Sequence, residues 1–188
     1  MGEATEAPGR SLAPGPLLAV AVGAAVAVAL GVYGRVHDPT GDTALVVVFS
    51  GQIQFKAWLA TLTILFAVVQ VVSALRLYGR LGSSPAPPWL GDLHRLSGTL
   101  ALIASLPIAY HCLWSIGFHA DAGLNRVFVH SVAGCLFYGA FALKVLAVRS
   151  DRLGRALPWV GGATFALLVL VWFTSSWWFF TSFEGALT

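Results

Sequence analysis

Charged residues are scarce in this sequence of 188 residues, of which 10% are charged and 57% hydrophobic. A soluble domain carries about 25% charged residues, so the composition argues against a water-soluble fold. The basic residues lie in short segments beside apolar runs rather than together on one soluble face. This distribution gives no support for nucleic-acid binding and is typical of a membrane protein.

Carboxylates are missing from the middle of the apolar stretches. Acidic side chains inside a membrane commonly form the proton relays of transporters, and their absence weighs against a proton-driven transporter. No catalytic constellation and no internal repeat stand out, so an inverted-repeat transporter also has little support. The acidic residues that follow the first apolar stretch all fall in expected loops or helix ends: Asp38, Asp42, Asp92, Asp121, Asp151 and Glu184.

Five apolar stretches account for most of the chain, each near the ~20 residues that cross a bilayer as a helix. They predict an all-α integral membrane protein with helices over about 17–33, 55–77, 93–116, 127–148 and 157–180. Helices 2 to 5 are expected to form a four-helix bundle. This single transmembrane domain, roughly 17–181, lies between a flexible cytoplasmic N-terminus (about 1–16) and a short extracytoplasmic tail (about 182–188).

The arginines predict the orientation in the membrane. Basic residues near helix ends favour the cytoplasm, so the N-terminus is expected inside and the C-terminus outside. Arginine outnumbers lysine nine to two, which suggests a GC-rich bacterial genome and therefore a multi-pass protein of a bacterial plasma membrane. Lys144, in the inner half of helix 4, is expected to snorkel to the cytoplasmic interface. The arginines on the expected inner side are Arg76, Arg80, Arg95, Arg149, Arg152 and Arg155.

Two histidines share a local pattern in which a glycine follows one helical turn later. The pairs are His94 with Gly98 and His130 with Gly134, and residues four apart lie on the same helix face. A glycine there removes the side chain that would collide with a flat macrocycle, so the pattern suits porphyrin ligation. Small residues also let membrane helices pack closely, and this second interpretation stays open.

His111 lies 17 residues after His94, which places it about 25 Å further along helix 3 at ~1.5 Å per residue. Those two histidines cannot bind one metal. Helix 4 runs back inward, so His111 and His130 lie at comparable depth near the outer face. They predict one haem b ligated by His111 and His130, with His94 as a second-site or structural residue. Pro107 is expected to kink helix 3 and to alter the direction of His111.

The stretch from Leu93-His94-Arg95-Leu96-Ser97-Gly98 to Gly117-Phe118, followed by His130-Ser131-Val132-Ala133-Gly134, resembles the two central helices of cytochrome b561-type membrane proteins. The resemblance covers roughly residues 92–148. It implies two b haems within four helices, each held by histidines from non-neighbouring helices, with His94 facing an inner haem and His130 an outer one. Helices 2 and 5 lack the partner histidines. The overall run of motifs also resembles a five-helix membrane family of actinobacteria with no established activity.

The sequence therefore predicts a membrane-embedded b-type haem electron-transfer subunit in contact with lipid. Quinol or an extracytoplasmic redox protein would be its electron partner. One alternative is a cofactor-free scaffold subunit whose histidines only make hydrogen bonds between helices. The other is a copper- or zinc-binding protein that uses the histidines of the outer side. The cysteines could add sulfur ligands, although their directions diverge from those of the neighbouring histidines. The residues of this alternative are His37, His111, His119 and His130, with Cys112 and Cys135.

Overall fold

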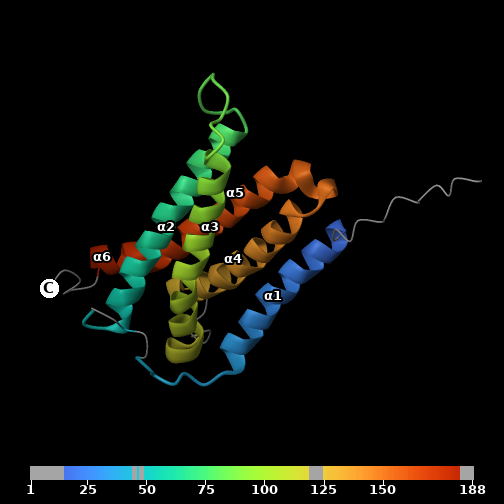
Figure 1. The fold of residues 1–188 in the computed structure, drawn as a ribbon. Coiled ribbons are helices and arrows are strands. Elements are labelled where there is room, and N and C mark those ends of the chain that lie inside the picture. Colours follow the sequence, from blue (N-terminus) through green and yellow to red (C-terminus); the bar gives the residue numbers. More distant parts are fainter. Residues whose placement is uncertain (1–14, 44–45, 47–48, 119–124, 183–188) are drawn as a thin grey trace, which may run out of the picture.

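The computed structural model describes residues 15–43, 46, 49–118 and 125–182, which form helices joined by short segments (Figure 1). The prediction of an all-α protein with five helices long and apolar enough to cross a membrane is confirmed. The predicted N-terminal segment before residue 15, the tail from residue 183 onward and His119 lie outside the described residues. The five helices long and apolar enough to cross a membrane are Pro16–Val36, Gln52–Leu77, Leu90–Ile116, Arg126–Val148 and Asp151–Ser182.

Two of these spans are composite. The third consists of α3 (Leu90–Tyr110) and a π-helical segment, η1 (His111–Ile116). The fifth begins with a 3₁₀ turn, η2 (Asp151–Ala156), and continues as α5 (Leu157–Trp172). A second π-helical segment, η3 (Phe173–Trp177), then leads into α6 (Trp178–Ser182). The remaining spans are α1 (Pro16–Val36), α2 (Gln52–Leu77) and α4 (Arg126–Val148).

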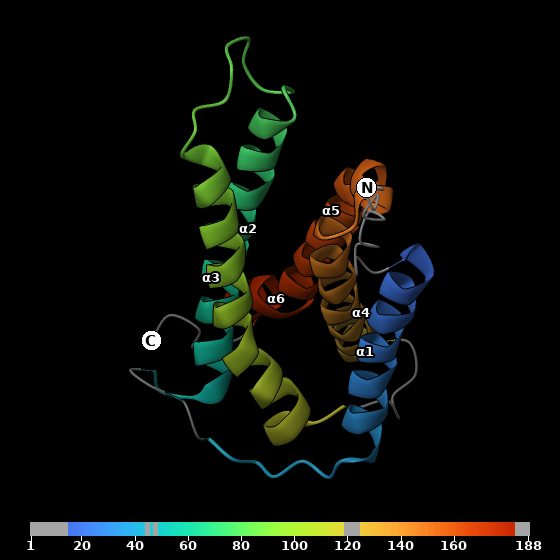
Figure 2. The same cartoon turned by 45° about the vertical axis from the view of Figure 1, so that its right-hand side comes forward.

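The helices pack in two groups. α2 packs on α3, while α4 packs between α1 and α5, and α2 joins the groups through its contacts with α5 and η3. Figures 1 and 2 show the α2–α3 pair diverging from α1, α4 and α5 toward the end where the chain turns from α2 to α3 and from α4 to α5. We call this the basic end, because Arg76 and Arg149 lie there. Helices 2 to 5 thus meet as two pairs, and α1 covers α4.

At the basic end, one side chain organises the loop between α2 and α3. The Arg76 guanidinium donates hydrogen bonds to the carbonyl oxygens of Leu81 (2.9 Å), Ser84 (2.5 Å) and Pro85 (3.2 Å). Five guanidinium N–H donors in one plane suit several carbonyl acceptors at once. The proline-rich loop therefore closes back onto the end of the helix that precedes it.

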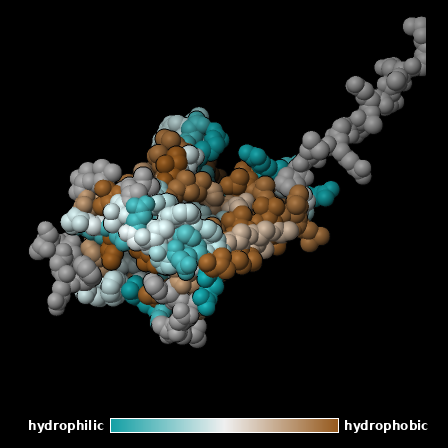
Figure 3. All heavy atoms as spheres, turned by 90° about the horizontal axis from the view of Figure 1, so that it is seen from below, coloured by the Kyte–Doolittle hydropathy of each residue, from teal (hydrophilic) through white to brown (hydrophobic). Residues whose placement is uncertain are grey.

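At the opposite end, the segment after α1 satisfies carbonyl groups that η1 leaves without helical partners. The backbone N–H groups of Thr40 and Gly41 donate to the carbonyl oxygens of Trp114 and Ser115, at 3.1 and 3.0 Å. Gly117 then turns the chain with a φ of 80°, a conformation that favours glycine. Figure 3 shows the molecule from this end. Hydrophilic and neutral residues gather on the end face, and hydrophobic residues cover the part that extends to one side.

Candidate functional site

His130, one turn into α4, is held by a hydrogen bond to the fifth span. Its Nδ1 lies 3.2 Å from the carbonyl oxygen of Val171 and 3.1 Å from the hydroxyl of Thr174. A carbonyl oxygen only accepts hydrogen bonds, and the Thr174 hydroxyl already donates to Leu170 at 2.7 Å. Nδ1 therefore carries the proton, and Nε2 presents a lone pair.

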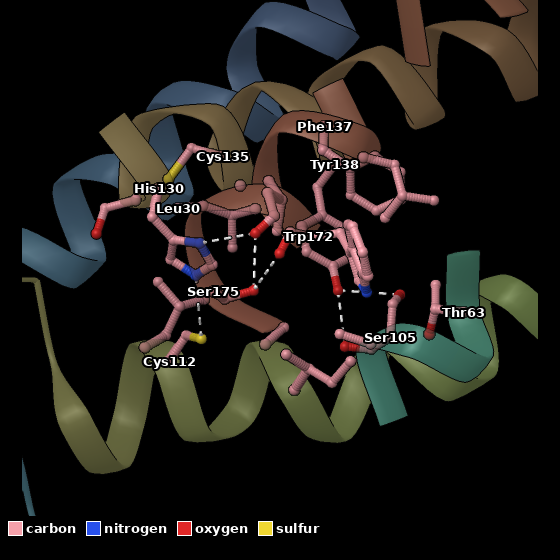
Figure 4. A pocket seen from close by; sticks show the side chains of 18 of the residues that line it. Leu30, Thr63, Ser105, Cys112, His130, Cys135, Phe137, Tyr138, Trp172 and Ser175 are labelled. Carbon is pink, nitrogen blue, oxygen red and sulfur yellow. Dashed lines mark hydrogen bonds between the residues drawn. The ribbon is translucent and has the colours of Figure 1, made fainter. Parts of the chain in front are cut away.

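The lone pair of His130 faces a cysteine. Nε2 lies 3.9 Å from the sulfur of Cys112, which belongs to η1. Figure 4 shows the His130 ring directed at this sulfur, whereas the sulfur of Cys135 lies on the opposite side of the His130 ring from Cys112. A thiol and an imidazole with these orientations can share a proton or a metal ion.

Two cavities meet at His130. The His130 cavity, of about 80 Å³, lies between Leu30 of α1 and the facing sides of α3, α4 and α5. The Lys56 cavity, of about 170 Å³, adjoins it through Cys112 and His130 and also contains Arg126. A Cβ added to Gly134 would meet no atom within 4 Å. In the second His-x-x-x-Gly pair, the glycine therefore faces open space.

Both π-helical segments contribute to this region. η1 supplies Cys112, and η3 supplies Thr174. A π-helical turn inserts an extra residue into the helical register and is frequently found at functional sites. Pro107 cannot donate a backbone hydrogen bond, and the register changes one turn later, where η1 begins at His111. The register shift therefore decides which side chains of the third span face α4.

His111 itself faces a different neighbour. It is completely buried, and its ring makes edge contacts with Phe55 of α2 and Tyr110, at centroid distances of 5.7 and 5.3 Å. It lines none of the three cavities described for this chain. The structure does not bring His111 and His130 to a common cavity, and their joint ligation of one haem stays a prediction.

His37 is also directed elsewhere. Its Nε2 donates to the carbonyl oxygen of Trp114 at 3.3 Å, and its ring packs on the indole at a centroid distance of 4.5 Å. Among the described residues, no group of three or more His, Cys, Asp or Glu side chains is arranged to hold a metal ion. The predicted set of outer-side metal ligands is therefore not assembled in the described part of the chain.

The largest of the three cavities described here lies in the basic-end half, between α2, α3, α4 and α5. This Lys144 cavity has a volume of about 320 Å³. His94 of α3 lines it, and its Nδ1 lies 2.8 Å from the hydroxyl of Ser73 on α2. Because that hydroxyl donates to Val69 at 2.6 Å, it accepts from Nδ1. His94 therefore also presents Nε2 as a lone pair, in the same way as His130.

A polar bridge crosses this cavity from α4 to α3. Lys144 donates to the side-chain oxygen of Gln70 at 2.9 Å, rather than extending to the membrane interface as expected. The amide nitrogen of Gln70 donates to the His94 carbonyl and to Ser97. A Cβ on Gly98 would lie 3.0 Å from the Gln70 amide, so this glycine makes room for the glutamine. No acidic residue of the described chain lines the cavity.

The sequence did not identify Gln70, Ser73 or Thr174 as site residues. Gln70 carries a usable signal, because an amide in the middle of an apolar span must find hydrogen-bond partners. The two hydroxyls carry none, since Ser and Thr in membrane helices commonly bond to their own backbone. Both do so here, and their pairing with histidines depends on how the helices meet.

The fold and these cavities define an all-helical protein with five helices able to cross a membrane and with a histidine at each of the three interhelical cavities. The chain belongs to a family of unknown function, DUF6529, whose model matches residues 16–187. Neither the curated proteins nor the solved structures contain a match to it.

Proposed function

We propose that this protein is a membrane-embedded b-type haem electron-transfer subunit with its haem in the Lys144 cavity and His94 as an iron ligand. The observation that carries the proposal is the state of the His94 ring. Its Nδ1–H donates a hydrogen bond to Ser73, which leaves Nε2 with a lone pair, and the side chain lines the largest of the three described cavities. A second hydrogen bond of this kind typically fixes the tautomer and orientation of metal-binding histidines.

The residues around His94 fit a haem. Cofactor sites commonly have volumes of about 300–1,000 Å³, and of the three cavities only the Lys144 cavity, at about 320 Å³, reaches that range. Across the cavity, a Cβ added to Gly161 or Gly162 would meet no atom within 4 Å. The α5 backbone there leaves room for a flat group. Lys144 offers a cation, and no carboxylate of the described residues lines the cavity, which suits the propionate groups of a haem.

In this proposal, the haem supplies the iron that carries the electron, while the protein sets its environment. His94 would hold the iron, and Ser73 would fix the direction of the imidazole. Gln70 holds Lys144 at the cavity wall. The resemblance to cytochrome b561-type proteins agrees with a haem facing His94 but implies a second histidine. Among the described residues, His94 is the only histidine that lines this cavity, and we therefore propose a single protein ligand.

We also propose that the basic end faces the cytoplasm of a bacterial cell, following the positive-inside rule. The mouth of the Lys144 cavity, near the exposed residues Tyr78 and Val148, then lies at the cytoplasmic interface. Quinol in the bilayer or a redox protein would exchange electrons with the haem from there.

A reduced-minus-oxidised visible spectrum and a pyridine haemochrome assay on detergent-purified protein test the haem. We expect a b-type signal in the wild type and its loss in His94→Ala and His94→Asn. The asparagine amide retains a hydrogen-bond donor toward Ser73 but has no Nε2. His37→Ala, which lies outside the cavity, should retain the signal. Haem-replete cells that yield colourless wild-type protein would overturn the proposal. If the b-type signal were lost in His111→Ala and His130→Ala but retained in His94→Ala, the haem would instead lie at the end opposite the basic end.

A cofactor-free scaffold is the second candidate function. The observation in its favour is that His94 and His130 both make hydrogen bonds between helices, to Ser73 and Thr174. Such bonds hold membrane helices together without any cofactor. The asparagine variant distinguishes the two functions, because a purely structural His94 would be replaced by asparagine with little loss of stability in a protein that never contained haem.

A further inference from the structure

Cys112 and His130 come from different spans and face each other across a gap of 3.9 Å between Sγ and Nε2. We infer that a single Cu(I) ion binds between these two atoms. This site lies in the His130 cavity, away from the Lys144 cavity, and it does not rest on the haem proposal. On binding, Cu(I) replaces the thiol proton of Cys112, which is released to solvent, and no electron is transferred.

The distance fits one bound ion. Metal–thiolate and metal–imidazole bonds of about 2.3 and 2.0 Å add up to about 4.3 Å in a straight line. An ion bound to both atoms therefore fits the 3.9 Å gap with a bent arrangement. If the sulfur and the nitrogen moved about 0.4 Å further apart, the sulfur–metal–nitrogen arrangement would be linear.

The ligand atoms are already oriented for this role. The bond from Nδ1 of His130 to Val171 leaves Nε2 with its lone pair toward Cys112. Outer hydrogen bonds of this kind raise the basicity of a ligating imidazole and fix its direction. The two π-helical segments supply the thiol and the Thr174 hydroxyl that accepts from the imidazole. Two register shifts at one small cavity point to a site rather than to ordinary helix packing.

The number of ligands favours Cu(I) over zinc. Structural zinc sites have four protein ligands and catalytic ones have three, whereas Cu(I) is stable with two. The described residues contain no group of three or more metal-binding side chains. A thiolate suits both Cu(I) and zinc, so the number of ligands decides between the two metals.

Charge leads to the same conclusion. One thiolate, one neutral imidazole and Cu(I) form a neutral unit, whereas Zn²⁺ with these ligands leaves a net positive charge in an apolar cavity, where an isolated charge is costly. Lys56 and Arg126 line the adjoining cavity. Their charges repel a divalent ion twice as strongly as a monovalent one.

The test is an anaerobic Cu(I) titration of the full-length protein in detergent, in competition with a chromophoric Cu(I) chelator. We expect one Cu(I) per chain in the wild type and at least 100-fold weaker binding in Cys112→Ser and His130→Asn. Cys135→Ser is the matched control, because Cys135 lines the same cavity but its sulfur lies on the opposite side of the His130 ring from Cys112. This variant should bind copper as the wild type does. Failure of the wild type to compete, or wild-type affinity in Cys112→Ser, would overturn the site.

X-ray absorption on the copper-loaded wild type provides a readout that does not depend on the folding of any variant. One sulfur and one nitrogen around copper are expected. A first shell without sulfur would refute the assignment, as would preferential uptake of Zn²⁺ in the titration. If the protein showed a haem spectrum but bound no copper, the copper site would be refuted while the haem proposal would stand.

Discussion

Gly23 of α1 lies against Gly139 of α4 so closely that a Cβ on Gly23 would come within 2.8 Å of the Gly139 carbonyl oxygen. Small residues at such crossings let two membrane helices approach each other backbone to backbone. This contact explains why α1 packs on α4 as a full member of the helical assembly. The sequence grouped only helices 2 to 5, since nothing in the composition of helix 1 says which neighbour its glycines meet.

Replacing Gly23 with leucine should destabilise the protein by about 1–3 kcal/mol, because the side chain overpacks the α1–α4 contact. Thermal unfolding in detergent would measure the change. Gly31→Leu is the control on the same helix, since a Cβ there meets no atom within 4 Å. Equal stability of the two variants would mean that α1 and α4 do not cross at this glycine.

Tyr138 ties the two groups of helices together. Its hydroxyl donates to Ser105 of α3, with 2.9 Å to the carbonyl oxygen and 3.0 Å to the hydroxyl. Interhelical hydrogen bonds in membrane proteins contribute about 0.6 kcal/mol on average and up to about 1.7. Tyr138→Phe should therefore lower the stability by an amount in this range, measured by unfolding in mixed micelles. Tyr78→Phe is the control, because Tyr78 is 55% exposed, and its stability should equal that of the wild type. An equal loss of stability in both variants would contradict a specific hydrogen bond between α3 and α4.

The two His-x-x-x-Gly pairs illustrate how far the sequence could predict the site. Apolar run lengths were enough to predict five spans, since the bilayer thickness fixes helix length. The identical histidine–glycine spacing, however, leads to different surroundings: Gly134 faces open space, whereas Gly98 faces the Gln70 amide. Spacing along one helix determines which residues share a face, but the residue opposite that face comes from another helix.

The directions of His111 and Cys112 were beyond sequence reasoning for a related reason. A regular helix turns by about 100° per residue, and the predicted haem ligand pair assumed that this turn continued to the end of the third span. The π-helical segment η1 begins at His111. Such a register shift is favoured by tertiary contacts rather than by local propensity, so the sequence did not indicate that Cys112 would face His130.

Lys144 should influence the redox potential of a haem in its cavity. A unit charge interacts with another at ~10 Å by about 1.7 kcal/mol at an effective dielectric constant of ~20. Removing the cation in Lys144→Gln disfavours the extra electron, so the midpoint potential should fall by several tens of millivolts. Spectroscopic redox titration measures this fall. Lys56→Gln provides the control, because Lys56 lines a different cavity. An unchanged potential in Lys144→Gln, or an equal fall in both variants, would contradict the haem position.

The arginines of the basic end predict which sites face each side of the membrane. Alkaline phosphatase is active only outside the cytoplasm, and green fluorescent protein folds inside it. A phosphatase fusion after Thr188 should therefore be active, and a fluorescent fusion after Ser84, in the loop that Arg76 holds, should fluoresce. The reverse pattern would invert the topology. In the predicted orientation, the Lys144 cavity opens toward the cytoplasm, so electrons would reach the haem from inside the cell. Cys112 and His130 lie near the outer face, so copper would reach its site from outside.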